Sequence, residues 1–256
     1  SCPAASGACP IGAFQAVVGS SKFSFSYYIT GFLILLGVLL GRFICGFLCP
    51  FGWFQELLHK IPTKKLSTKK LKPLTYLKYA VLLVMVFLLP AFLVNDVGMG
   101  DPFFCKYLCP QGVLEGAIPL SLANSGIRAA LGKLFTWKFS ILLSVIALSV
   151  LFYRPFCKWL CPLGAFYALF NRVSLFQMKV DKNKCVSCGK CARACKMDVD
   201  VTKTPNHAEC IRCGMCIRAC PTNAVRFRYG FGDGKDKEKA AETPRKNQNN
   251  KEEQNI

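Results

Sequence analysis

The chain has 256 residues, of which 52% are hydrophobic and 16 are cysteines, and it carries a formal net charge of +19. Its apolar and basic runs are separate from one another, which is typical of a membrane protein. Nucleic-acid binding would also suit a strong positive charge. We predict no nucleic-acid partner, because the Lys and Arg residues cluster beside apolar segments, where the positive-inside rule accounts for them.

The first 22 residues are small and polar, and they carry Cys2 and Cys9. No signal peptide precedes Cys2, and the chain starts with Ser1 rather than Met. We therefore expect a further helix upstream in the intact protein.

Three segments are predicted to cross a membrane as helices: Phe23 to Leu48, Leu74 to Val94, and Leu134 to Tyr153. Each approaches the roughly 20 apolar residues that a span requires. We expect Arg42 to snorkel toward the interface at the end of the first span, and Pro90 to kink the second.

Charge predicts the orientation of these spans. Residues 59–72 carry six lysines and no acidic residue, whereas residues 95–133 carry only three basic residues. The positive-inside rule then places 59–72 and everything after Arg154 in the cytoplasm, and places 1–22 and 95–133 on the opposite side.

A Cys-Pro-x-Gly motif occurs four times around these spans. The motifs begin at Cys9, Cys49, Cys109 and Cys161; Cys45, Cys105 and Cys157 stand four residues before the last three, and Cys2 stands seven before the first. Thiols at positions i and i+4 face one side of a helix, and a cluster needs four ligands, so each pair would supply half a site. The Pro suits the start of a new helix, and the Gly suits a tight turn or close packing.

Successive motifs are separated by one span each, so they are predicted to alternate between the membrane faces. This groups the cysteines into an inner quartet and an outer quartet, namely Cys45, Cys49, Cys157 and Cys161, and Cys2, Cys9, Cys105 and Cys109. We expect an Fe–S cluster at the inner quartet. The outer quartet holds either another cluster or, in an oxidising compartment, disulfides. Buried cysteines that act only as small apolar residues are the remaining alternative.

The stretch 185–220 contains C-x2-C-x2-C-x3-C twice, which is the spacing of a bacterial two-cluster ferredoxin. In that arrangement the fourth cysteine of each run binds the other cluster. Two [4Fe–4S] clusters are therefore predicted, with ligand sets Cys185, Cys188, Cys191 and Cys220, and Cys210, Cys213, Cys216 and Cys195. Zinc is the alternative metal. Short strands are expected at Gln177 to Val180 and at Val225 to Tyr229.

The expected organisation is an α-helical membrane domain over 1–176, a small α+β ferredoxin domain with a βαβ repeat over 177–229, and a disordered tail over 230–256. The histidines, His59 and His207, lie outside the predicted spans, so a bis-His haem has no ligands there. Both are expected at the solvated surface.

Repeated CxxxCP motifs on membrane helices, followed by a two-cluster ferredoxin, resemble the NapH / NosR / MauN-type membrane polyferredoxin family. The resemblance covers roughly residues 23–229 and rests on Cys45/Cys49-Pro50, Cys157/Cys161-Pro162 and the eight ferredoxin cysteines. It implies an iron–sulfur electron carrier linked to quinone or respiratory chemistry. The longer spacing from Cys2 to Cys9 departs from the family motif.

The function predicted is electron transfer between a cytoplasmic redox partner and the cytoplasmic membrane, by a subunit of an oxidoreductase complex rather than a stand-alone catalyst. A redox sensor or assembly protein is the alternative. Residues 181–229 carry ten Lys or Arg against four Asp or Glu, so we expect either an acidic electron carrier or anionic lipid to bind there. Quinone is a further candidate ligand.

Overall fold

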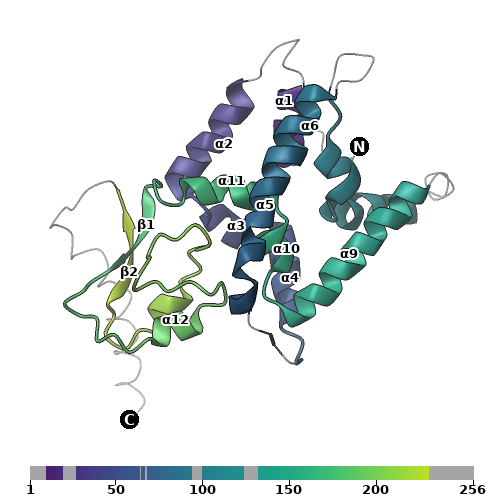
Figure 1. Ribbon diagram of the computed structural model, residues 1–256. Helices are drawn as coiled ribbons and strands as arrows, with labels where there is room; N and C mark the ends of the chain where they lie inside the picture. Colours follow the sequence, from purple (N-terminus) through teal and green to yellow (C-terminus); the bar gives the residue numbers. More distant parts are fainter. Residues whose placement is uncertain are drawn as a thin grey trace.

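The computed structural model describes residues 10–19, 27–63, 65–66, 68–93, 100–123 and 132–230. A group of helices lies beside a small module that contains the two strands (Figure 1). Cys2, Cys9 and the expected disordered tail lie outside the described residues, apart from Gly230.

The helical part consists of short helices and two long helical segments. Its helices are α1 (Pro10–Gly19), α2 (Tyr27–Leu40), α3 (Phe43–Phe47), α4 (Pro50–His59), η2 (Thr68–Tyr76), α5 (Leu77–Val81), η3 (Leu82–Leu88), α6 (Leu89–Phe92), η4 (Phe104–Leu108), η5 (Gly112–Ala117), α7 (Ile118–Ala123), α9 (Lys133–Leu151), α10 (Pro155–Trp159) and α11 (Pro162–Phe170).

Two helical segments are long and apolar enough to cross a membrane, Leu71–Phe92 and Lys133–Leu151, and they match the second and third predicted spans. The first predicted span is not confirmed. Helix α2 has 14 residues, or about 21 Å at 1.5 Å per residue, against a hydrocarbon core of about 30 Å. It ends because Gly41 takes a φ of 56°, which turns the chain. The expectation that Arg42 snorkels is wrong, since its side chain is fully buried.

Pro90 affects the segment Leu71–Phe92 by widening the helical turns in front of it. Residues Leu82–Leu88 form π-helical turns, and the N–H of Leu89 bonds the carbonyl of Val84, five residues earlier. Because proline has no N–H to continue an α-helical ladder, the wider turns let the chain pass Pro90 and continue as α6.

The small module contains β1 (Phe176–Val180), α12 (Lys190–Ala194), α13 (Met215–Arg218) and β2 (Val225–Tyr229). The strands pair antiparallel, from Phe176 opposite Tyr229 to Val180 opposite Val225. Both predicted strands are confirmed, with β1 starting one residue earlier. The expected βαβ repeat is wrong: within residues 132–230 no strand lies between α12 and α13, because turns and the cysteine loops occupy that stretch.

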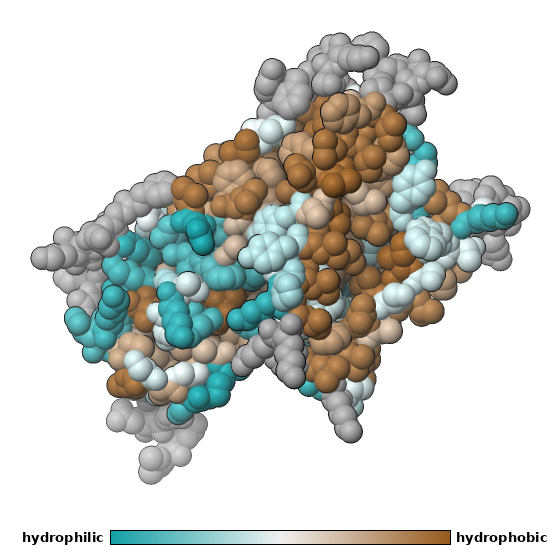
Figure 2. Space-filling view, viewed as in Figure 1, coloured by the Kyte–Doolittle hydropathy of each residue, from teal (hydrophilic) through white to brown (hydrophobic). Residues whose placement is uncertain are grey.

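Three groups of buried apolar residues hold the molecule together. One fills the helical part, and a second lies between the strands and the module's helices. The third forms the junction between the two parts and consists of Tyr153, Met197, Val199 and Ile211. Apolar surface covers much of the helical part, whereas polar surface gathers toward the module (Figure 2).

Candidate iron–sulfur sites

Each complete CxxxCP motif forms a sharp elbow between two short helices. In the inner motifs the first cysteine lies in a helix, Cys45 in α3 and Cys157 in α10, while Cys49 and Cys161 have extended backbones and precede α4 and α11. The motif proline begins the next helix, as predicted. The expectation that both thiols of a pair share one helix face is wrong, because the helix ends between them.

The two inner elbows meet around one cavity. It is lined by all four cysteines of the inner quartet, Cys45, Cys49, Cys157 and Cys161, and by Arg42, Ile44, Arg154, Leu163, Gly164, Met197 and Ile211. Next to this lining, the Nε2 of Gln55 lies 3.2 Å from Cys157 Sγ. The structure thus brings together four thiols that lie up to 116 positions apart in the sequence.

The two ferredoxin runs repeat one backbone conformation. Ser187 and Arg212 each stand two positions after the first cysteine of their run, and both have positive φ. Gly189 and Gly214, just before α12 and α13, also have positive φ. Glycine takes this left-handed conformation without a steric cost. The same turns therefore recur at equivalent positions of both runs.

A second cavity lies at the first ferredoxin run. Its lining includes Cys185, Cys188 and Cys191 together with Cys220 from the second run, which is the predicted exchange of the fourth cysteine. Cys188 is exposed to solvent and Cys191 is buried.

The remaining ferredoxin thiols also lie near one another. Burial raises the pKa of Cys216 to about 12, and the nearby thiols of Cys210, Cys213 and Cys195 contribute to the rise. A ligand must bind as a thiolate, so metal binding has to displace this proton. Cys195 and Cys213 pack against Ile211 and Met197 at the junction, which makes this set the one nearer to the inner quartet.

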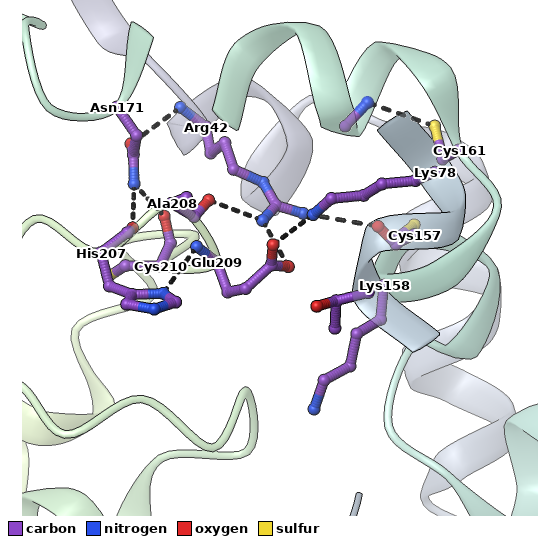
Figure 3. A network of polar contacts seen from close by, with 12 residues as sticks. Arg42, Lys78, Cys157, Lys158, Cys161, Asn171, His207, Ala208, Glu209 and Cys210 are labelled. Carbon is purple, nitrogen blue, oxygen red and sulfur yellow. Dashed lines mark hydrogen bonds and ion pairs between the residues drawn. The ribbon is translucent and has the colours of Figure 1, made fainter. Parts of the chain in front are cut away.

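Buried charges join the module to the helices (Figure 3). Glu209 accepts hydrogen bonds from Arg42, at 2.8 Å, and from Lys78. Arg42 also donates to the carbonyl of Ala208 at 2.8 Å. Burial alone would raise the pKa of Glu209, but Arg42 and Lys78 outweigh burial and lower it, so the carboxyl group is ionised.

Two further residues hold the module at the end of α2. Asn171 donates to the carbonyls of His207 and Cys210. Arg212 donates to the carbonyl of Leu40, at 2.7 Å, and to Ser174 Oγ. The carbonyl of Leu40 lies at the C-terminus of α2, where a cation is favourable. A Cβ on Gly41 would lie 2.6 Å from Arg212 Nη1, so this contact requires glycine.

Of the outer quartet, the structure describes Cys105 and Cys109. Cys105 lies in η4, and its carbonyl accepts a hydrogen bond from Lys138, near the beginning of α9. The inner motif that contains Cys157 begins just after the other end of α9. A helix of 19 residues is about 28 Å long, so the two motifs lie toward opposite ends of it.

The polar residues around the inner cavity were not predicted from the sequence. A signal was present: Arg42 and Arg154 each stand three positions before the first cysteine of an inner motif, which extends the motif to R-x-x-C-x-x-x-C-P-x-G. The two histidines, expected at the solvated surface, are only partly exposed. His59 is half-buried against Tyr153, and the Nδ1 of half-buried His207 accepts the N–H of Glu209.

No three His, Cys, Asp or Glu side chains in the described part of the chain converge closely enough to hold a single metal ion. Two of the cysteine sets line cavities, one at the first ferredoxin run and one at the inner quartet. Four thiolates are the ligand set that holds an iron–sulfur cluster.

The fold and the cysteine sites define a ferredoxin-type iron–sulfur protein. A family described as "4Fe-4S binding domain" matches residues 7–27, 24–69, 78–118 and 134–183, and a second family of the same description matches 178–199 and 204–226. The chain belongs to this 4Fe–4S binding family, whose ferredoxin-type members include NosR, MauN and NapH.

Among curated relatives, the protein MJ0750 of Methanocaldococcus jannaschii is 32% identical over 78% of this chain and 77% of its own length. The putative electron transport protein YccM of Escherichia coli is 26% identical over 66% of this chain and 45% of its own length. The methylamine utilization ferredoxin-type protein MauN of Paracoccus denitrificans is 29% identical over 64% of this chain and 50% of its own length. No solved structure matches.

Proposed function

We propose that this protein is a membrane-bound electron carrier that passes electrons between a cytoplasmic redox partner and the membrane. One observation carries the proposal: the cavity of the inner quartet is closed by Met197 and Ile211, which belong to the ferredoxin module. Ile211 follows Cys210 directly, and Met197 is two residues from Cys195. The second ferredoxin site and the inner site therefore share a wall.

Within this proposal, the first ferredoxin set holds one [4Fe–4S] cluster, the second set holds another, and the inner quartet holds a third. The clusters, when bound, supply one-electron redox chemistry. Solvent exposure falls along this series, from the exposed Cys188 of the first site to the buried Cys45 of the inner site. Apolar side chains at the junction exclude water between the second and third sites.

The surface of the long helices supports a place in the membrane. Few residues of the two long segments are buried within the molecule: 28% of the most apolar stretch of Leu71–Phe92, and 17% of that of Lys133–Leu151. Large apolar side chains are therefore exposed along both, including Leu83, Phe92, Trp137 and Leu143. A contiguous apolar surface of this kind calls for lipid or another protein.

The outer quartet would extend the route to the other membrane face. Cys105 and Cys109 lie toward the opposite end of α9 from Cys157, which agrees with the proposed alternation of the motifs between faces. We propose that they join Cys2 and Cys9 in a fourth cluster; disulfides are the alternative. Quinone is the candidate membrane substrate.

An acidic electron carrier is the proposed cytoplasmic partner. Around the first ferredoxin cavity, Lys182, Lys184, Lys190 and Arg193 are all exposed, as is Cys188. Opposite charges steer such a partner toward the cluster. We expect the rate of reduction by an acidic donor to fall as ionic strength rises; a flat rate would favour lipid binding as the role of these charges.

A redox sensor or assembly factor is the second candidate. It is favoured by one relative, the regulatory protein NosR of Stutzerimonas stutzeri, which is 27% identical over 62% of this chain and of which the chain covers 21%. In that role the same clusters would report the redox state instead of conducting electrons.

The test uses the full chain, purified without oxygen, in lipid nanodiscs. Iron, zinc and acid-labile sulfide are measured per chain, and EPR spectra follow stepwise reduction. Three or four [4Fe–4S] clusters, and reduction of a membrane quinone by an acidic donor, are the expected results. Stoichiometric zinc, or clusters that never exchange electrons with quinone, would contradict the proposal.

A further inference from the structure

The two inner motifs exchange arginines across their shared cavity. Arg42 precedes the motif of Cys45, but its Nη2 donates to the carbonyl of Cys157, at 3.4 Å. Arg154 precedes the motif of Cys157, but its Nη1 donates to the carbonyl of Cys45, at 3.0 Å, and its Nη2 to that of Gly46, at 3.1 Å. Each guanidinium group therefore reaches the elbow of the opposite motif.

The motif glycines make room for this exchange. A Cβ on Gly52 would lie 3.3 Å from Arg154 Nη1, and one on Gly164 would lie 3.5 Å from Arg42 Nη2 and 3.2 Å from the carbonyl of Cys157. The glycine of each motif thus faces the arginine that comes from the other. Gly52 leaves room for Arg154 itself, and Gly164 leaves room for the Cys157 carbonyl that accepts from Arg42.

The backbone of Arg154 points to the same requirement. Its φ is 49°, in the left-handed region that glycine and asparagine occupy more easily than arginine. A strained residue persists where the surrounding structure demands it, and such residues gather at functional sites. Here the demand comes from the side chain, which is buried against the opposite motif.

The charges of the two arginines are only partly matched by the protein. Arg42 shares Glu209 with Lys78, and Arg154 pairs with the half-exposed Glu56, at 2.6 Å. Three buried cations therefore face two carboxylates. The Nε atoms of both arginines have no hydrogen-bond partner among the described residues, although both side chains are almost fully buried and line the cavity. An anion in the cavity would complete this arrangement.

Gln55 adds a neutral donor from a third direction. Its Oε1 accepts the N–H of Phe156, at 3.2 Å, which fixes the amide so that its Nε2 is directed at Cys157 Sγ. Local charge and hydrogen bonds to the sulfurs are two of the means by which a protein sets the potential of an iron–sulfur cluster. A cluster held by thiolates gains negative charge on reduction, so nearby cations and N–H donors favour the reduced state.

We propose that Arg42, Arg154 and Gln55 are positioning residues that lock the two inner motifs together and raise the reduction potential of the cluster bound between them. The inference rests on the proposed function, because it requires a cluster at the inner quartet. The arginines act through the carbonyls and charge around the thiolates, and Gln55 acts through the sulfur of Cys157.

The test is an EPR-monitored redox titration of the full chain in nanodiscs, with the inner signal defined as the one that Cys45→Ala removes. Arg154→Gln removes one cation and leaves Glu56 able to reach solvent. We expect its inner cluster to be about tenfold harder to reduce, a shift of about 59 mV for one electron. Arg154→Lys keeps the charge, so the potential of its inner cluster should lie close to that of the wild type. Gln55→Met should lower the potential in the same direction by a smaller amount.

Arg226→Gln is the matched control, because it removes one positive charge from an exposed position on β2. It should leave the inner potential unchanged. If Arg154→Gln fails to assemble the cluster, the potential of Gln55→Met decides, because Arg154→Lys is expected to stay close to the wild type. An inner signal with unaltered potential in Arg154→Gln, or in Gln55→Met where Arg154→Gln does not assemble, overturns this inference and leaves the proposed function standing. A wild-type chain with no signal that depends on Cys45 overturns both.

Discussion

The inner cavity and the first ferredoxin cavity present the same four-cysteine lining in opposite surroundings. The inner cavity lies between two parts of the molecule and is bordered by buried Arg42 and Arg154. The ferredoxin cavity is formed within a single module, opens beside the exposed Cys188 and carries its cations as solvated lysines around it. The exposed surroundings of the ferredoxin cavity thus suit electron exchange with another molecule, whereas the buried surroundings of the inner cavity suit electron transfer within the protein.

The contrast also shows what holds each site together. Backbone turns with positive φ shape each ferredoxin run, so the positions of the cysteines within a run depend on residues close by in the sequence. The inner site depends on contacts between residues more than 100 positions apart, such as Arg154 with Cys45. We therefore expect the inner site to be far more sensitive than the ferredoxin site to changes at the junction.

The largest effect should come from removing thiols. Cys45→Ala and Cys157→Ala should abolish one and the same EPR signal, because either change removes a ligand of a shared cluster. Cys191→Ala should remove a different signal and leave that one intact. Cys105→Ala should remove yet another signal or, if the outer thiols form disulfides, none. Loss of a single signal by both Cys45→Ala and Cys105→Ala would disprove the division into inner and outer quartets.

The next largest effect should come from Glu209→Gln. The amide cannot balance Arg42 and Lys78, which are both fully buried, and breaking a buried ion pair typically costs about 3–5 kcal/mol. We expect faster hydrogen exchange at residues 207–212 and protease cleavage between the helices and the module.

Glu56→Gln provides the control for that change, since Glu56 also pairs with an arginine but its side chain is 36% exposed against 8% for Glu209. Arg154 is buried but Glu56 reaches solvent, so the loss should be smaller than for the fully buried set around Glu209, and exchange at the junction should change less than in Glu209→Gln. Equal effects of the two variants would show that the junction does not depend on its buried charge.

A smaller effect is expected from Gly46→Ala. The added Cβ would lie 2.8 Å from the carbonyl oxygen of Ile211, a backbone atom that can move only with the module. Overpacking of this kind costs about 1–3 kcal/mol. Electron transfer between the ferredoxin clusters and the inner cluster should slow, while the iron content stays the same.

Gly31→Ala is the comparison for Gly46→Ala, because a Cβ there meets nothing within 4 Å. It lies inside α2, where alanine favours a helix over glycine by up to about 1 kcal/mol. The variant should be as stable as the wild type or slightly more so, with unchanged transfer. If both variants slow transfer alike, the close approach of Ile211 to α3 does not matter.

The sequence predicted local features well and long-range contacts poorly. The grouping of Cys220 with the first ferredoxin run, and of the second CPxG motif with the fourth, agrees with the two cavities that these thiols line. Their binding of clusters, and the alternation of the motifs between membrane faces, stay predictions. The first span is not confirmed, because the 26-residue segment Phe23 to Leu48 continues past Gly41, where one positive φ ends the helix. The roles of Arg42, Glu209 and Lys78 could not be predicted, since a charge beside an apolar run usually marks an interface. Only the fold shows that a carboxylate from the module meets them.

The smallest expected effect concerns pH and lies away from both cavities, at His59. Burial lowers the pKa of His59, and the nearby Lys65 lowers it further, against the opposing bond to the carbonyl of Ser149. The folded pKa is thus below the unfolded value of about 6.5. His59 therefore binds a proton more readily in the unfolded chain, and the folded state loses stability as pH falls from 6.5 through the folded pKa. Because the imidazole is only partly buried, this loss should be small.

Thermal melts of the wild type and of His59→Gln at pH 7.5 and 5.5 measure this loss. Other titrating groups contribute equally to both proteins, so they cancel in the difference between the two Tm values. We expect the wild type to lose more of its Tm than His59→Gln on going to pH 5.5, with the inner and ferredoxin EPR signals unchanged. An equal loss in both proteins would mean that His59 binds protons equally in the folded and unfolded chains. A larger loss in the variant would mean that the protonated ring is stabilised at the contact between α4 and α9, through Glu56 or the Ser149 carbonyl.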